Sequence, residues 1–230
     1  MKAFILAAGF GKRLRPLTET TPKPLLEVGG KPLIQYHIER LVSAGVTELV
    51  INAHWLKDKL IEFLGDGSQW GAEIHYSIEE ELLETGGGIR QALALLGDKP
   101  FLLVNGDVYL EYSFQNLLQK PLAGNLAHLL LVPNPNHNKK GDFSFSPSGC
   151  LKREMTRNQW TYAGVSLIDP KLVSGWPSEK EAFPLLSPLL EAAREGRLSG
   201  EVYSGLWEDV GTPERLEQLH KSLVKKGVSR

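Results

Sequence analysis

Basic side chains follow a short glycine-containing segment near the start of the chain. Residues 3–8 are apolar, Gly9 and Gly11 come next, and Lys12 and Arg13 follow at once. Glycines let backbone N–H groups approach a ligand closely, and exposed N–H groups with Lys and Arg side chains bind phosphate. The segment therefore predicts a phosphate site. A tight turn that carries solvated charges is the ordinary alternative.

Two familiar phosphate-binding loops do not match this segment. A dinucleotide-binding loop requires a third glycine where this chain has Leu14, and a Walker A loop requires Ser or Thr where it has Arg13. Farther along, Pro22 and Pro24 flank Lys23 and restrict the backbone around it. A solvated lysine normally lies on a less restricted surface, so Lys23 is a second candidate phosphate ligand.

Two aspartates far apart in the sequence are candidate metal ligands. Asp107 follows the apolar residues 101–104, and Asp209 precedes Thr212 and Pro213, which suit a helix start. Two carboxylates and a triphosphate together offer the oxygen ligands that Mg²⁺ prefers. We therefore expect Asp107 and Asp209 to form a magnesium site, with a turn residue and a helix-cap partner as the ordinary alternatives.

Other chemistries find little support. The six histidines show no zinc-binding spacing, no Gly-x-Ser-x-Gly sequence occurs, and Cys150 has no flanking nucleophile signature. One cysteine excludes an internal disulfide and a thiolate-rich metal site, and it favours a cytoplasmic location. The net charge of −1 argues against a nucleic-acid partner, and no apolar stretch is long enough for a signal peptide or membrane helix.

The candidate ligands must be positioned by an alternation of short apolar segments and helices over the first 135 residues. We expect strands over residues 3–8, 47–51, 73–78, 101–104 and 127–132, and helices over residues 32–44, 56–64 and 87–96. This order predicts an α/β, Rossmann-like, doubly wound and mostly parallel sheet. Ligands of such sheets bind beyond the carboxyl ends of the strands, which adds Asn52 and Asn105 to the polar residues of interest.

The second part of the chain predicts a smaller β-rich region and closing helices. We expect short strands over residues 143–145, 151–154 and 160–168, helices over 183–194 and 213–224, and an extended piece over 203–207. No linker or repeat separates the two parts, so residues 1–230 are expected to form one domain.

The glycine segment and the lysine resemble a known signature. Gly9, Gly11, Arg13, Pro16-Leu17-Thr18 and Lys23-Pro24 together are similar to the signature of the sugar-1-phosphate nucleotidyltransferases. The resemblance implies a GT-A-like fold, Mg²⁺ as cofactor, and a nucleoside triphosphate and a sugar 1-phosphate as substrates. It gives residues 1–135 the nucleotide and residues 136–230 the sugar.

The resemblance also implies roles for single residues. Arg13 would hold the departing pyrophosphate, Lys23 the α-phosphate, and Asp107 and Asp209 the metal, since they match the family's Gly-Asp and Trp-x-Asp-x-Gly-Thr sequences. The implied nucleotide contacts are Leu6, Ala7, Ala8, Gly9, Gly11, Lys12, Gly86 and Gly87, and the implied sugar contacts are Asn105, Gly141 and Glu154.

The segment from Glu84 to Gly88 is similar to the muramate and mannose branches of the family. Its three glycines suggest that a ligand ring lies against bare backbone, whereas the run Glu79–Glu81 is typical of a solvated cluster. Relatives often carry Glu-Lys-Pro where this chain has Glu154-Met155-Thr156, so the lysine that holds the sugar phosphate is missing here.

The implied reaction is uridylyl transfer to N-acetylmuramic acid 1-phosphate in cell-wall sugar recycling. Alternatives are guanylyl transfer to mannose 1-phosphate, thymidylyl or uridylyl transfer to glucose 1-phosphate, and cytidylyl transfer to a choline or alditol phosphate. A catalytically silent nucleotide-sugar sensor would be expected to have lost Arg13, Lys23, Asp107 or Asp209, and all four are present. We expect no appended acyltransferase domain, and the sequence leaves the oligomeric state open.

Overall fold

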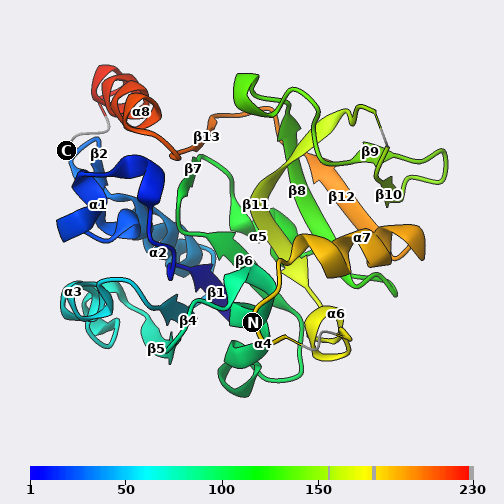
Figure 1. Cartoon of the computed structure of the whole chain (residues 1–230), viewed down its shortest axis with the longest axis horizontal. Helices are drawn as coiled ribbons and strands as arrows, with labels where there is room; N and C mark the ends of the chain where they lie inside the picture. The colour runs from blue at the N-terminus through cyan, green and yellow to red at the C-terminus, as the bar shows by residue number, and fades with distance from the viewer. Residues whose placement is uncertain (155, 178–179, 228–230) are drawn as a thin grey trace.

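A seven-stranded sheet forms the centre of the computed structural model, which describes residues 1–154, 156–177 and 180–227 (Figure 1). From edge to edge its strands are β12 (Leu198–Val202), β8 (Ala127–Pro133), β11 (Trp160–Ile168), β6 (Phe101–Asn105), β1 (Ala3–Leu6), β4 (Glu48–Ala53) and β5 (Glu73–Ile78). Only β11 runs antiparallel to its neighbours in this sheet. The predicted α/β fold with a mostly parallel sheet is therefore confirmed.

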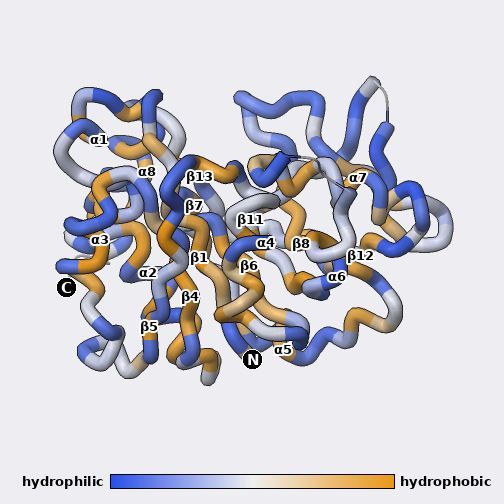
Figure 2. Tube along the Cα trace, turned by 60° about the horizontal axis from the view of Figure 1, so that its bottom comes forward, coloured by the Kyte–Doolittle hydropathy of each residue, from blue (hydrophilic) through white to orange (hydrophobic). Residues whose placement is uncertain are grey.

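Helices cover both faces of the sheet because alternate strand side chains point to opposite faces. On β1, Ile5 belongs to the core under one set of helices and Phe4 to the core under the other. The first set is α2 (Leu33–Ser43), α3 (Lys57–Leu64) and α5 (Phe114–Leu118); the second is α4 (Glu84–Leu96), α6 (Lys171–Ser174) and α7 (Leu186–Arg194). Figure 2 shows the apolar strands at the centre and hydrophilic loops around them.

A third, smaller core joins the two ends of the chain. The last helix, α8 (Pro213–Lys225), packs Leu219 and Leu223 near the hairpin of β2 (Glu27–Val28) and β3 (Lys31–Pro32), in a core shared with Tyr36. Just before α8, the chain forms a two-stranded antiparallel ladder of β7 (Val108–Leu110) and β13 (Trp207–Asp209). This ladder brings the C-terminal segment to the carboxyl end of β6, as Figure 1 shows.

The remaining elements are short. They are α1 (Leu17–Thr20), β9 (Ser144–Phe145), β10 (Leu151–Lys152), and 3-10 helices at Lys12–Leu14, Lys23–Leu25, Ser68–Trp70 and Asn136–Asn138. No helix in the described part of the chain is both long and apolar enough to cross a membrane.

Several elements differ from the sequence-based expectation. Helix α4 begins at Glu84, so its glycines lie inside the helix, and α7 begins at Leu186. The edge strand β12 was not predicted, and the extended piece expected over 203–207 falls mostly between β12 and β13. Apart from Leu198, the residues of β12 are not fully buried, so this strand lacks an apolar pattern.

Candidate active site

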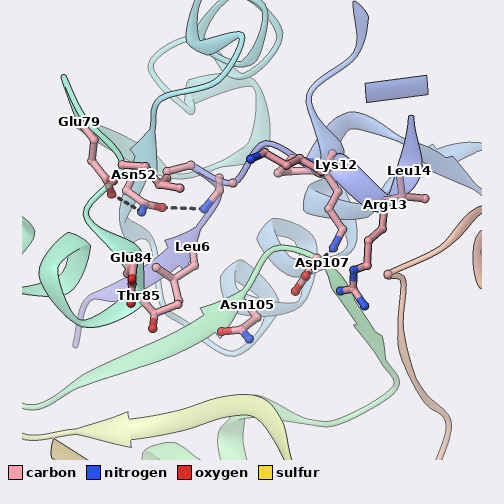
Figure 3. Close-up of a pocket in the computed structure, with 18 residues that line it drawn as sticks. Leu6, Lys12, Arg13, Leu14, Asn52, Glu79, Glu84, Thr85, Asn105 and Asp107 are labelled. Carbon is pink, nitrogen blue, oxygen red and sulfur yellow. Dashed lines mark hydrogen bonds and ion pairs between the residues drawn. The ribbon is translucent and has the colours of Figure 1, made fainter. Parts of the chain in front are cut away.

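One cavity of about 370 Å³ opens at the carboxyl ends of β1, β4 and β6. Ten of the residues implied by the family resemblance line it together, although they come from three separate segments. They are Leu6, Ala7, Ala8, Gly9, Gly11, Lys12, Arg13, Lys23, Asn105 and Asp107, and Figure 3 shows several of them converging. The other lining residues are Leu14, Pro24, Asn52, Glu79, Leu82, Glu84, Thr85 and Gly211.

The glycine segment turns sharply after β1 and presents two cations to the cavity. Gly11 has a φ of 61°, and a Cβ there would lie 2.7 Å from the Cγ2 of Thr18. Only glycine meets both conditions without strain. The 3-10 helix that follows buries Leu14, so Lys12 and Arg13 lie along the cavity wall.

The cations of the cavity are only partly neutralised. Lys23 is almost buried, and its Nζ lies 2.5 Å from Oδ2 of Asp107. Within the described ranges, Arg13 makes no hydrogen bond or ion pair, and Lys12 only places its Nζ 5.3 Å from the centre of the Phe10 ring. The cavity wall therefore carries positive charge that suits a phosphate ligand.

The two candidate metal ligands lie at one end of the β7–β13 ladder. Asp209 is paired with Val108, and the N–H of Val210 donates to the backbone oxygen of Asp107 over 2.9 Å. No group of three or more His, Cys, Asp and Glu side chains that could hold a metal ion occurs among the residues that the structure describes. The protein can thus offer two carboxylates, a donor set that suits Mg²⁺ when substrate phosphates and water complete the shell.

Asp209 already has two neighbours of its own. Its Oδ2 accepts a hydrogen bond from Nη1 of Arg215 at 2.9 Å and lies 3.4 Å from Nε2 of His137. Burial lowers the pKa of His137, and the charges of Arg215 and Arg13 lower it further against the raising effect of Asp209. Arg215, whose guanidinium keeps its charge at any ordinary pH, is therefore the cation that balances Asp209.

A buried hydrogen-bonded network supports the start of the glycine segment. The amide of Asn52 accepts from the N–H of Ala7 at 2.6 Å and donates to Oε1 of Glu79 at 2.6 Å, as Figure 3 shows. The other oxygen of Glu79 accepts the N–H of Leu83 at 2.9 Å. In the sequence, Asn52 was a residue of interest because it follows a predicted strand. By contrast, the prediction that Glu79 belongs to a solvated cluster was wrong, because this residue is 2% exposed.

The structure places neither Gly86 nor Gly87 in the cavity wall. Both N–H groups donate to the backbone oxygen of Phe183, at 2.8 and 3.2 Å, and a Cβ on Gly87 would lie 2.2 Å from the backbone oxygen of Glu181. Gly86 and Gly87 thus admit a crossing segment of the chain, and their contact with the nucleotide stays a prediction. The neighbouring Thr85 lines the cavity instead.

The three predicted sugar contacts are divided between two cavities. Asn105 lines the first, whereas Gly141 and Glu154 line a second of about 370 Å³, together with Lys140 and Lys152. Strand β11 leads from one to the other. A Cβ on its Gly164 would lie 2.8 Å from Nδ2 of Asn105, and the N–H of its Tyr162 donates to Asp142, next to Gly141, at 2.9 Å.

The comparisons with known proteins agree with this geometry. A family model described as nucleotidyl transferase matches residues 2–143. The N-acetylmuramate alpha-1-phosphate uridylyltransferase of Neisseria meningitidis serogroup B is 49% identical over 95% of this chain and 96% of its own length. The mannose-1-phosphate guanyltransferase of Emericella nidulans is 34% identical over 93% of this chain, which spans only 62% of that relative.

Solved structures show the same fold. A Bacillus anthracis protein crystallised with sucrose superposes with a TM-score of 0.87 over 97% of this chain and 95% of its own, at 22% identity. At that level of identity the likeness concerns the fold alone.

Proposed function

This chain belongs to the nucleotidyl transferase family, and from that premise we propose that it transfers a uridylyl group from UTP to N-acetylmuramic acid 1-phosphate. The products are the UDP-sugar and pyrophosphate. The observation that carries the reaction class is the meeting of the glycine segment, Arg13, Lys23 and Asp107 in one cavity. The choice of base and sugar rests on the 49% identity to the meningococcal enzyme.

An oxygen of the sugar 1-phosphate attacks the α-phosphorus in line with the bond to the departing pyrophosphate. That phosphate is already ionised at neutral pH, so the step requires positioning and charge neutralisation more than a general base. Lys23 neutralises the α-phosphate, and Arg13 and Lys12 receive the pyrophosphate.

Asp107 and Asp209 are the side chains that would hold Mg²⁺, which supplies further neutralisation of the phosphate charge when bound. The ion pair between Lys23 and Asp107 would have to open for this, which would free the Lys23 ammonium to face the α-phosphate. The network of Glu79, Asn52 and Ala7 keeps the glycine backbone in place during this exchange.

The proposal treats residues 1–230 as one catalytic domain. Residues 1–135 hold the nucleotide, and residues 136–230 contribute the sugar contacts, with Asn105 at the border. Gly141 and Glu154 then receive the far side of the sugar, in the second cavity. The enzyme would act in the cytoplasm, where nucleoside triphosphates are made.

A substrate panel tests the proposal. The purified protein is incubated with Mg²⁺, each of the four nucleoside triphosphates, and the 1-phosphates of N-acetylmuramic acid, N-acetylglucosamine, mannose and glucose, and pyrophosphate release is measured. We expect the highest kcat/KM with UTP and N-acetylmuramic acid 1-phosphate. A preference for GTP with mannose 1-phosphate would overturn the assignment of substrate, and the absence of release with every pair would favour a silent sensor.

A further inference from the structure

Arg215 is a cation near the cavity to which the family signature gives no role. It lies in the first turn of α8, six residues after Asp209, and its side chain is only 13% exposed. Its Nη1 donates to Asp209 at 2.9 Å. Its Nη2 has no hydrogen-bond partner in the described part of the chain, so the protein leaves the N–H groups of that nitrogen unused.

The Nη2 side of the Arg215 guanidinium lies beside Arg13. Both guanidinium groups converge on Gly211, which lines the cavity. A Cβ built on Gly211 would lie 2.2 Å from Nη2 of Arg215 and 2.9 Å from Nη2 of Arg13, so these two nitrogens are no more than about 5.1 Å apart. Glycine at position 211 is what permits both side chains to reach the same place.

This arrangement holds two positive charges against one negative charge. Arg13 has no anionic partner within the described ranges, and Asp209 is the anionic partner of Arg215. Two like charges held this close repel each other unless an anion lies between them. Donors about 5 Å apart can both reach a single oxygen at the 2.7–2.9 Å of a charge-assisted hydrogen bond.

We propose that Arg215 is a second pyrophosphate-binding residue, which acts with Arg13 on the departing group. The proposal rests on the proposed nucleotidyl transfer, because that reaction supplies the pyrophosphate. Arg13 and Arg215 approach the same phosphate oxygens from the two ends of the chain, and Asp209 holds Arg215 in place before the ligand arrives.

Calorimetric titration of inorganic pyrophosphate in the presence of Mg²⁺ tests this role without requiring turnover. Arg215→Gln should weaken pyrophosphate binding by about 10- to 100-fold, as expected for a lost charge-assisted hydrogen bond. Arg215→Lys should lose less affinity, because lysine keeps the positive charge and lacks only the paired N–H donors of the guanidinium. Lys221→Gln removes one charge from an exposed position of the same helix and should change the affinity less than twofold.

A second titration separates ligand binding from the positioning of Asp209. Mn²⁺ is added to the wild-type and Arg215→Gln proteins without nucleotide, and binding is followed by electron paramagnetic resonance. We expect equal or tighter Mn²⁺ binding in the variant, since a cation has left Asp209. Pyrophosphate affinity within twofold of wild type, or a loss that only matches a loss of Mn²⁺ affinity, would overturn the proposal.

The two proposals fail in different ways. A wild-type protein that binds pyrophosphate through Arg215 but transfers no nucleotide would contradict the function alone. A wild-type protein that turns over normally, with an Arg215→Gln variant of unchanged pyrophosphate affinity, would contradict only the role of Arg215. If Arg215→Gln does not fold, the Arg215→Lys protein carries the same comparison.

Discussion

Arg13 is an exposed cation in the cavity wall, and it makes few interactions that could stabilise the folded state. It has no ion pair or hydrogen bond among the described residues, whereas Lys23 and Arg215 are each paired with a carboxylate. A side chain held in the cavity wall without a partner is available for a ligand. Loss of the Arg13 side chain should therefore reduce turnover and leave the stability of the fold nearly unchanged.

Replacement of Arg13 by alanine tests this distinction. We expect turnover to fall by about a hundredfold or more, because a cation that faces the departing phosphates is lost. The Tm should stay within about 2 °C of wild type, since few interactions within the protein are removed. Lys221→Ala is the matched control for one lost surface charge. Near-wild-type turnover in Arg13→Ala would contradict the role of this residue.

His37 gives the protein a stability that depends on pH. Burial and the charge of Arg40 lower its pKa to about 4, against smaller raising effects of the Val108 backbone and of Asp107. In the unfolded chain the pKa returns to about 6.5. The unfolded state thus binds more protons between these values, and stability is full above about pH 6.5 and falls as the pH drops toward 4.

Urea unfolding at two pH values measures this effect. Between pH 7 and pH 5, we expect His37 to cost about 2 kcal/mol of unfolding free energy, from 1.36 kcal/mol per pKa unit. The buried His128, whose pKa is also lowered by burial, adds to the change in the same direction. His37→Phe should reduce the pH dependence by the His37 share, and an unchanged dependence in this variant would contradict a buried neutral imidazole.

At the scale of elements, α4 owes its position to glycines that helices normally avoid. On propensity alone, Gly87→Ala would stabilise the helix by about 1 kcal/mol. The new Cβ would instead lie 2.2 Å from the backbone oxygen of Glu181, and a backbone atom cannot move as a side chain can. We expect a net loss of about 1–3 kcal/mol in unfolding free energy, measured by urea unfolding.

Position 94 of the same helix provides the control. Ala94 is exposed, so Ala94→Gly should cost about 1 kcal/mol through propensity alone. If Gly87→Ala instead raised the unfolding free energy by about 1 kcal/mol, as propensity alone predicts, the segment at Glu181 would not be packed against α4.

The strands that position the site were largely predictable, because unbroken apolar segments mark strands buried on both faces. The boundaries of β5 and β11 matched the expectation, and the last residues of β1 and β6 with those that follow them supplied ten of the eighteen residues of the cavity wall. The ladder of β7 and β13 was not predicted. Each strand has three residues, and their pairing depends on contacts across about a hundred positions of sequence.

Two parts of the site were beyond sequence reasoning for the same reason. Arg215 reads as an ordinary residue in the first turn of an amphipathic helix, and only the fold brings it to Arg13. The packing of Gly86 and Gly87 against the crossing segment near Phe183 could not be foreseen from the sequence either. In both cases the decisive neighbour lies about 100 or more positions away along the chain.

At the scale of the whole molecule, the third core packs the C-terminal helix α8 against the N-terminal part of the chain. Leu223 is fully buried in this core, whereas its neighbour Val224 is 48% exposed. Leu223→Ala should lower the unfolding free energy by about 2–5 kcal/mol. Val224→Ala should change it by about 0.5 kcal/mol or less.

Thermal and urea unfolding compare these two variants. Because α8 carries Arg215, we also expect Leu223→Ala to weaken pyrophosphate binding, while Val224→Ala leaves it unchanged. Equal stability of both variants would mean that α8 is not held by this core.

The ion pairs of Lys23 with Asp107 and of Arg215 with Asp209 have one further consequence. A cavity that already contains its own counter-ions does not need to gather as many from the solution. Arrival of the triphosphate is then in part an exchange of one anionic partner for another, with few dissolved ions displaced. The affinity for the nucleotide should therefore fall less steeply with rising ionic strength than it would if Lys12, Arg13, Lys23 and Arg215 were all unpaired.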